Sequence, residues 1–136
     1  MRSEPAYLVI ARDIENAILD GEDSEDALAP SAGALARRYG VNIATAARAL
    51  RTLQDRGVVC RLPGIGMHIL AGCRTALMTE RRASFVRDYL EPFLDEAHRV
   101  GLSSVELAGE LSARLCAVDS TALTRADDLE RPVRGE

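Results

Sequence analysis

Residues 30–57 read PSAGALARRYGVNIATAARALRTLQDRG, and this stretch decides the fold. Ser31 stands just ahead of an apolar run and can cap a short helix that ends before Gly40. Asn42 can cap a second helix, which Gly57 ends. Two short helices joined by a tight glycine-containing turn predict a helix-turn-helix.

The flanking segments complete a larger unit. Residues 5–20 carry apolar side chains at helical spacing and predict an amphipathic helix. An acidic loop follows at residues 22–26. Residues 58–62 and 67–70 are short β-rich runs around the turn at residues 63–66, which predicts a hairpin. Helix, helix-turn-helix and hairpin in this order predict a mainly α fold with a small β-hairpin, the winged helix-turn-helix.

The C-terminal part predicts two further helices. The first begins near Thr79 and ends at Gly101, with Pro92 inside it as an expected kink or local break. Ser103 and Glu106 form a capping box for the second, which continues to about residue 117. We therefore expect a winged helix-turn-helix domain at residues 1–74, a helical dimerisation region at 75–118 and a disordered tail at 119–136.

Composition excludes several classes. No apolar run approaches the roughly 20 residues that cross a bilayer, and the three widely spaced cysteines predict no disulfide framework, so we expect a cytoplasmic protein. No cluster of histidine, cysteine and acidic residues has metal-ligand spacing. No nucleophile has an evident base beside it, and no phosphate loop is present. The sequence predicts no enzyme, no cofactor and no metal.

Charge is distributed unevenly. The whole chain of 136 residues has a net charge of −4, which by itself argues against a nucleic-acid partner. Residues 37–61, however, hold six arginines against one acid, Asp55, a local net charge of +5. A merely solvated face is the alternative explanation. The arginines are Arg37, Arg38, Arg48, Arg51, Arg56 and Arg61.

Helical periodicity favours a DNA-binding face. If the apolar residues of the second helix, Ala46, Ala49, Leu50 and Leu53, face the core, a rotation of about 100° per residue exposes Ala44, Arg48 and Arg51. This is the element that enters the major groove in such units, where arginine binds phosphate or guanine edges.

The predicted DNA-binding set extends beyond that helix. Gly64 and Gly66 are first of all what a tight hairpin requires, with a backbone contact to DNA as an added role. His68 can reach a DNA phosphate, and the alternative is a half-exposed histidine on the strand without that role. Cys60 is interpreted as a small apolar filler, with a redox role as the alternative. The predicted residues are Ser31, Arg37, Arg38, Asn42, Ala44, Thr45, Arg48, Arg51, Gly64, Gly66 and His68.

The ordered series over residues 7–70 resembles the winged-helix domain of the GntR family of bacterial transcription factors. The segments that carry the resemblance are AILDG (17–21), VNIATAARALRTL (41–53), GVV (57–59) and GIG (64–66). This resemblance implies a DNA-binding regulator whose second helix reads the operator.

Residues 93–103, FLDEAHRVGLS, resemble the two-helix tail of the short YtrA-like branch of that family. In that branch the helix pair serves dimerisation, so the resemblance implies a homodimer that reads a two-fold symmetric operator. The predicted dimerisation residues are Phe85, Tyr89, Leu90, Phe93, Leu94, Leu107 and Leu111.

Four positions depart from the family pattern. Gly33 stands where the family usually has arginine, and Ile43 and Ala47 stand where many members have a basic residue. Ile65 replaces a basic residue between the two glycines of the hairpin tip. Fewer cations neutralise fewer phosphates, so we expect modest binding with a smaller salt-dependent part.

The leading hypothesis is a homodimeric, sequence-specific transcriptional regulator of double-stranded DNA, expected to repress. The alternative is a winged-helix protein-interaction module or accessory regulator with weakened or lost DNA binding, in which apolar Ile43 and Ile65 dock a protein partner. A third hypothesis is a sensor of a small molecule, although no residue pattern indicates an effector.

Overall fold

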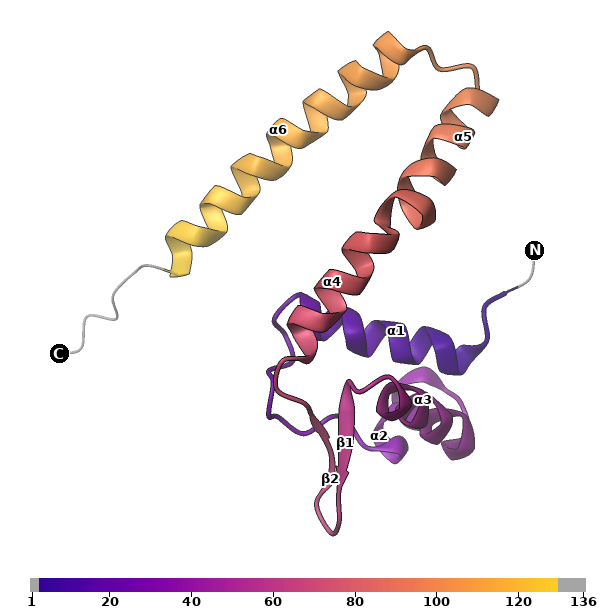
Figure 1. The fold of residues 1–136 in the computed structure, drawn as a ribbon, viewed down its shortest axis with the longest axis vertical. Coiled ribbons are helices and arrows are strands. Elements are labelled where there is room, and N and C mark those ends of the chain that lie inside the picture. The colour runs from indigo at the N-terminus through magenta and orange to yellow at the C-terminus, as the bar shows by residue number, and fades with distance from the viewer. Residues whose placement is uncertain (1–2, 130–136) are drawn as a thin grey trace, which may run out of the picture. The chain divides into compact units, whose positions relative to one another are not determined.

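The computed structural model describes residues 3–129, and the chain divides into one unit up to Ser84 and another from Phe85. The elements, shown in Figure 1, are α1 (Ala6–Leu19), α2 (Ala32–Tyr39), α3 (Ile43–Asp55), β1 (Val59–Leu62), β2 (Gly66–Ile69), α4 (Cys73–Phe85), the π-helical turn η1 (Val86–Leu90), α5 (Glu91–Arg99) and α6 (Ser104–Leu129). Within residues 3–129, no helix is both long and apolar enough to cross a membrane.

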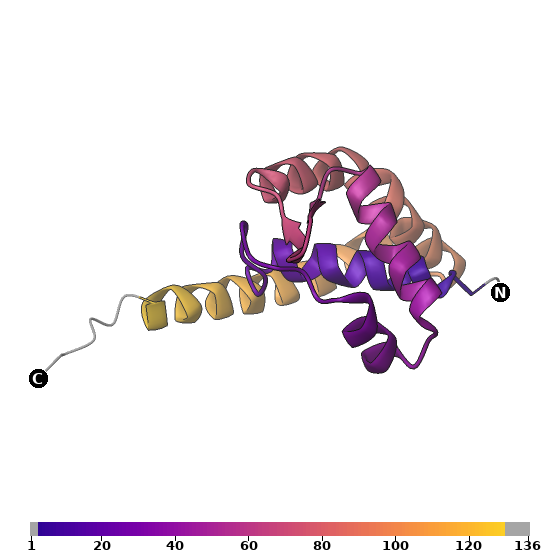
Figure 2. The same ribbon diagram turned by 90° about the horizontal axis from the view of Figure 1, so that it is seen from below.

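The core of the first unit forms where α3 packs against α1 and α2, an arrangement visible from below in Figure 2. The four residues expected to face the core from α3 are all buried, as are Val59 and Ile69 of the hairpin. Burial of each large aliphatic side chain contributes about 1.5–3 kcal/mol. The buried apolar residues of the three helices are Ile10, Ala11, Ile14, Ile18, Leu35, Ala36, Ala46, Ala49, Leu50 and Leu53.

Both predicted helix caps of the helix-turn-helix are confirmed. Ser31 Oγ accepts a hydrogen bond from the Ala34 N–H at 3.1 Å, and Asn42 Oδ1 accepts one from the Thr45 N–H at 2.8 Å. Gly40, between the helices, has φ 64°, a left-handed conformation that suits glycine.

The hairpin has an edge segment that the sequence did not predict. β1 pairs antiparallel with β2 in a register that sets Cys60 opposite His68. Residues 26–29 then lie along the free edge of β2, where the Ala29 N–H donates to the Met67 carbonyl at 2.8 Å and Leu28 bridges to His68. Alternation of apolar and polar residues is absent from this short segment, so only the long-range pairing reveals it.

Helix α4 begins at Cys73, six residues before the expected Thr79. The carboxylate of Glu25, from the acidic loop, accepts the Arg74 N–H at 3.1 Å and so caps this helix from a distant part of the chain. Hydrogen bonds from the backbone of Gly72 and Arg74 lower the pKa of Glu25.

The expected break at Pro92 takes the form of η1. The Glu91 N–H donates to the carbonyl of Val86, five residues earlier, because proline lacks the N–H that would continue the α-helical pattern. The predicted capping box is confirmed by hydrogen bonds in both directions between Ser103 and Glu106. Helix α6 runs to Leu129, beyond the expected end near residue 117; the rest of the predicted tail lies outside the described residues.

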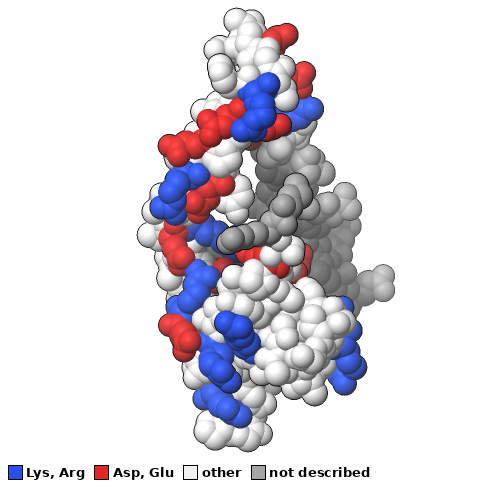
Figure 3. All heavy atoms as spheres, turned by 90° about the vertical axis from the view of Figure 1, so that its right-hand side faces the viewer, with Lys and Arg blue, Asp and Glu red and all other residues white. Residues whose placement is uncertain are grey.

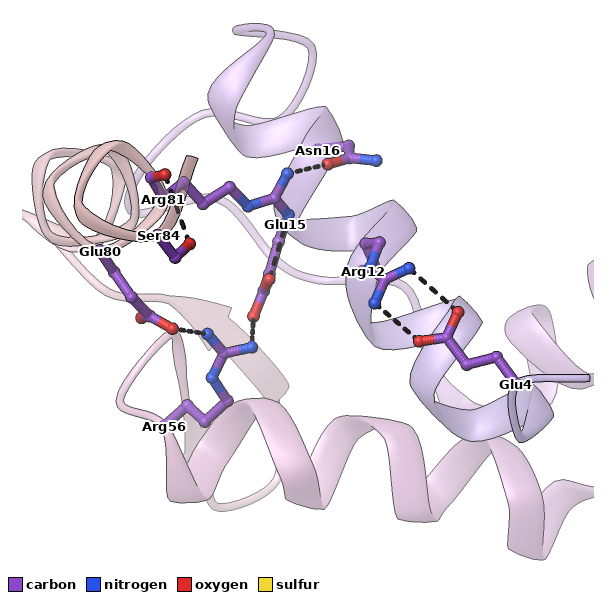
Figure 4. A network of polar contacts seen from close by, with 8 residues as sticks. All are labelled: Glu4, Arg12, Glu15, Asn16, Arg56, Glu80, Arg81 and Ser84. Carbon is purple, nitrogen blue, oxygen red and sulfur yellow. Dashed lines mark hydrogen bonds and ion pairs between the residues drawn. The ribbon is translucent and has the colours of Figure 1, made fainter. Parts of the chain in front are cut away.

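A buried carboxylate connects three helices of the first unit (Figure 4). Glu15 on α1 is 3% exposed and pairs with Arg56 at the end of α3 and, at 3.2 Å, with Arg81 on α4. Arg56 also pairs with Glu80 at 2.7 Å, and Arg81 donates to Asn16.

Glu15→Gln tests this network. The substitution keeps the side-chain shape but leaves two guanidinium groups without their shared charge, so the free energy of unfolding should fall by about 2–4 kcal/mol in urea denaturation. Glu4→Gln is the matched control, because Glu4 pairs with Arg12 on the surface, where loss should cost under about 1 kcal/mol. Equal effects of the two substitutions would contradict a structural role for Glu15.

Candidate nucleic-acid interface

Helix α3 presents a polar face away from the core. Ala44, Arg48 and Arg51 are exposed, as periodicity predicted, and Thr45 lies half-buried in the first turn beside Asn42. The Thr45 side chain also donates to Asn42 Oδ1 at 3.0 Å. One side of the helix is therefore available for contact with a ligand, and its N-terminus is held by a defined cap.

Arg48 has an aromatic partner that the sequence did not predict. Its guanidinium lies 3.9 Å from the centroid of the Tyr7 ring, which comes from the first turn of α1. An arginine over an aromatic face is restricted in orientation but keeps its N–H groups for acceptors at the ring's edge. Tyr7 therefore orients one of the predicted DNA-binding residues.

A hollow of about 440 Å³ opens between α3 and the hairpin. Arg51 and Gln54 line it from α3, and Arg61 and Gly66 line it from the hairpin. Ser31, at the N-terminus of α2, closes a further side. Among the described residues, no acidic side chain pairs with Arg51 or Arg61, so the hollow is positively charged and suited to an anion.

The six arginines of residues 37–61 do not all belong to one DNA-facing surface. Arg56 belongs to the Glu15 network and is an ion-paired structural residue. Arg37 and Arg38 are exposed in the last turn of α2, where cations complement the helix dipole, and neither lines the hollow. Figure 3 shows that arginine side chains still prevail over acidic ones in the lower part of the view, where the hairpin and the helix-turn-helix lie.

The hairpin residues separate into two groups. Gly66 lines the hollow, and Gly64 forms the turn with φ 76°. His68 does not line the hollow: its side chain is 20% exposed and contacts Cys60 and Asp26. His68 therefore occupies the half-exposed strand position that was expected as the alternative to a DNA contact.

The four departures from the family pattern lie in or near this surface. Ile43 and Ile65 are 63% and 65% exposed, and Ala47 and Ile65 line the hollow. Gly33 is half-buried in the first turn of α2. Sequence reasoning predicted Ser31 but missed Tyr7, Gln54 and the other hollow-lining residues of 28–32, because their contribution depends on long-range packing.

Comparisons with known proteins agree with this fold. The family model described as bacterial regulatory proteins, gntR family, matches residues 6–69. No curated protein matches the chain significantly.

Three solved structures are similar over most of the chain. A GntR-family transcriptional regulator from Bacteroides thetaiotaomicron is 27% identical, with a TM-score of 0.59 over 82% of this chain and 96% of that one. A transcriptional regulator from Oenococcus oeni is 21% identical, with a TM-score of 0.67 over 85% and 94%. A GntR-family regulator from Listeria monocytogenes is 19% identical, with a TM-score of 0.66 over 83% and 97%.

The last two identities are low enough that they support the fold alone. The family match and the Bacteroides structure both indicate the fold of GntR-type transcriptional regulators. Over residues 6–69, the chain is therefore similar to the gntR family of bacterial regulatory proteins.

Proposed function

We propose that this protein is a homodimeric transcriptional repressor that binds a two-fold symmetric operator through α3. The observation that carries the proposal is the hollow, to which Arg51 of α3 and Arg61 of the hairpin contribute from two sides. Both arginines would neutralise a DNA phosphate that lies between the major groove and the adjacent minor groove. Repression would follow from occlusion of the promoter, and we expect the protein in the cytoplasm with the chromosome.

The reading of bases is assigned to the exposed face of α3. An α-helix fits the major groove, and small Ala44 lets the helix backbone approach closely. Arg48, oriented by Tyr7, and Arg51 can each bind a guanine edge or a phosphate. Asn42 and Thr45 stand at the helix N-terminus, where phosphate binding is favoured.

Arg48→Ala and Arg51→Ala should each lower affinity by about ten- to a hundredfold for a site selected from a random DNA pool at low salt. Loss of a phosphate contact should also reduce the slope of log K against log salt by about 1. Arg114→Ala is the matched control, because Arg114 pairs with Glu110 on α6 and its loss removes the same charge elsewhere. Unchanged affinity in both α3 variants would overturn the proposal.

Gly33→Arg should strengthen binding. A Cβ atom at Gly33 would meet only Ser31 Oγ, at 4.0 Å, so the backbone accepts a side chain there. The added cation should raise affinity by about three- to tenfold and steepen the salt dependence. Gly33→Ala is the control, since it gives the same gain in helix propensity without charge. If the two variants bind DNA equally, position 33 does not face phosphate.

Dimerisation is assigned to the second unit. Phe85, Tyr89, Phe93 and Leu94 are each 41–55% exposed, and the rings of Phe85 and Tyr89 stack at 5.7 Å. Exposed large apolar side chains at this density indicate an interaction surface. Leu90 and Leu111 are also exposed, and Leu107 is half-buried. The resemblance to the short YtrA-like branch supports a second copy as the occupant.

Phe93→Glu should convert the dimer to a monomer, because it puts a charge into the proposed interface. Sedimentation should give twice 14.7 kDa for the natural chain and 14.7 kDa for the variant, with a matching loss of affinity for a two-half-site operator. Val105→Glu is the control: Val105 is 82% exposed in the first turn of α6, where an acid is favourable. A natural chain that stays monomeric at micromolar concentration would contradict the assignment.

A second candidate function is a protein-docking module. Exposed Ile43, Ile65 and Leu28 favour it, because Leu28 and Ile65 both line the hollow. Copurified nucleic acid, seen as a raised absorbance ratio, would support DNA binding. A stoichiometric protein partner that is lost in Ile65→Asp would support docking.

A further inference from the structure

Cys60, His68 and Asp26 form a connected group on the hairpin. The Sγ atom of Cys60 lies 2.9 Å from Nδ1 of His68, and Nε2 of the same ring lies 3.7 Å from Oδ1 of Asp26. The imidazole thus has a thiol at one nitrogen and a carboxylate at the other. This is the order of nucleophile, base and orienting acid that activates a cysteine.

The fold sets up this group through backbone pairing. Cys60 and His68 are direct partners in the β1–β2 register, which brings their side chains onto one face of the hairpin. Asp26 is held by a hydrogen bond from its N–H to the Ile69 carbonyl at 2.8 Å. Its φ of 65° is a left-handed conformation, unusual outside glycine although tolerated by aspartate, that persists where surrounding contacts fix it.

The group is accessible and separate from the hollow. Cys60 is half-buried, and the side chains of His68 and Asp26 are 20% and 73% exposed, so the group borders solvent. Because side chains alternate along a strand, Cys60 points away from the face that carries Arg61. Among the described residues, no three His, Cys, Asp or Glu side chains are placed to hold a metal ion. The arrangement suits covalent chemistry at sulfur.

The other two cysteines have different environments. Cys73 is 5% exposed, and burial raises the pKa of its thiol, which keeps it protonated and unreactive. Cys116 is exposed on α6. The chain therefore contains a shielded thiol and an accessible thiol against which Cys60 can be compared.

We propose that Cys60 is a hydroperoxide-reactive thiol for which His68 is the base and Asp26 the positioning residue, and that its oxidation weakens DNA binding. His68 Nδ1 takes the thiol proton, and the sulfur attacks one oxygen of hydrogen peroxide or an alkyl hydroperoxide. The O–O bond breaks, and the departing oxygen takes the proton from His68. Sulfur is oxidised to sulfenic acid while the hydroperoxide is reduced to water or an alcohol.

Oxidation of Cys60 alters the contact between the two strands. The 2.9 Å gap between Sγ and Nδ1 cannot hold an added oxygen, so an oxygen on that side of the sulfur displaces the His68 ring or the strands. Those strands lead directly to Leu62 and Gly66, which bound the turn, and Gly66 lines the hollow. The loss of DNA affinity rests on the proposed function, whereas the reactivity of Cys60 does not.

The reactivity is measured on the full chain by treating it with hydrogen peroxide, trapping sulfenic acid with dimedone, and locating adducts by mass spectrometry. Cys60 should be trapped first. His68→Asn should slow trapping at least about tenfold, because a positioned base typically contributes 10²–10⁴-fold.

Asp26→Asn tests the positioning residue, because asparagine suits the left-handed backbone equally well. This substitution should slow trapping of Cys60 less than His68→Asn does. Asp26→Asn should also reduce the ultraviolet absorbance of the thiolate without changing the Tm. Replacement of a merely structural residue would not give this combination. A Cys60 that reacts no faster than Cys116 overturns the proposal.

The regulatory effect is measured as DNA affinity before and after peroxide. After peroxide, the natural chain should bind DNA at least about tenfold more weakly, and dithiothreitol should restore its affinity. Cys116→Ser should behave in the same way. Cys60→Ser should lose many times less affinity than either. Trapped Cys60 with unchanged affinity would overturn the regulatory effect alone. Reduced protein that binds no DNA would refute the proposed function, while the trapping result would still decide the reactivity of Cys60.

Discussion

The buried carboxylate of Glu15 is the interaction on which the geometry of the first unit depends. The carboxylate is shielded from water, and its burial is offset because Arg56 and Arg81 share it. The two arginines come from the end of α3 and from α4, so α1 fixes both elements at once. The buried apolar face of α3 and this attachment at its C-terminal end together fix the position of the exposed arginines on the helix.

The hairpin has a different use on each face. One face carries Arg61 toward the hollow beside α3, and the other carries the Cys60–His68 pair. A strand transmits a change on one face to the other because its backbone is shared. A two-stranded element that places Val59 and Ile69 in the core can therefore also serve both for ligand contact and for control.

Local signals were sufficient to predict much of this fold. The caps at Ser31 and Asn42, the buried face of α3 and the capping box at Ser103 each depend on residues within one or two helical turns, and all are confirmed. The start of α4 was placed too late because its cap, Glu25, is distant in the sequence. The same reason explains why the edge segment at residues 26–29 and the stacking of Tyr7 on Arg48 were missed.

The arginine surface has a chemical consequence of its own. All 17 basic residues are arginine, so no side chain in this sequence carries an amine. A guanidinium keeps its charge at every physiological pH, and lysine acetylation has no target on such a surface. The positive potential of the hollow is therefore constant in the cell, and amine-directed labelling or crosslinking reagents would leave every side chain of this surface unmodified.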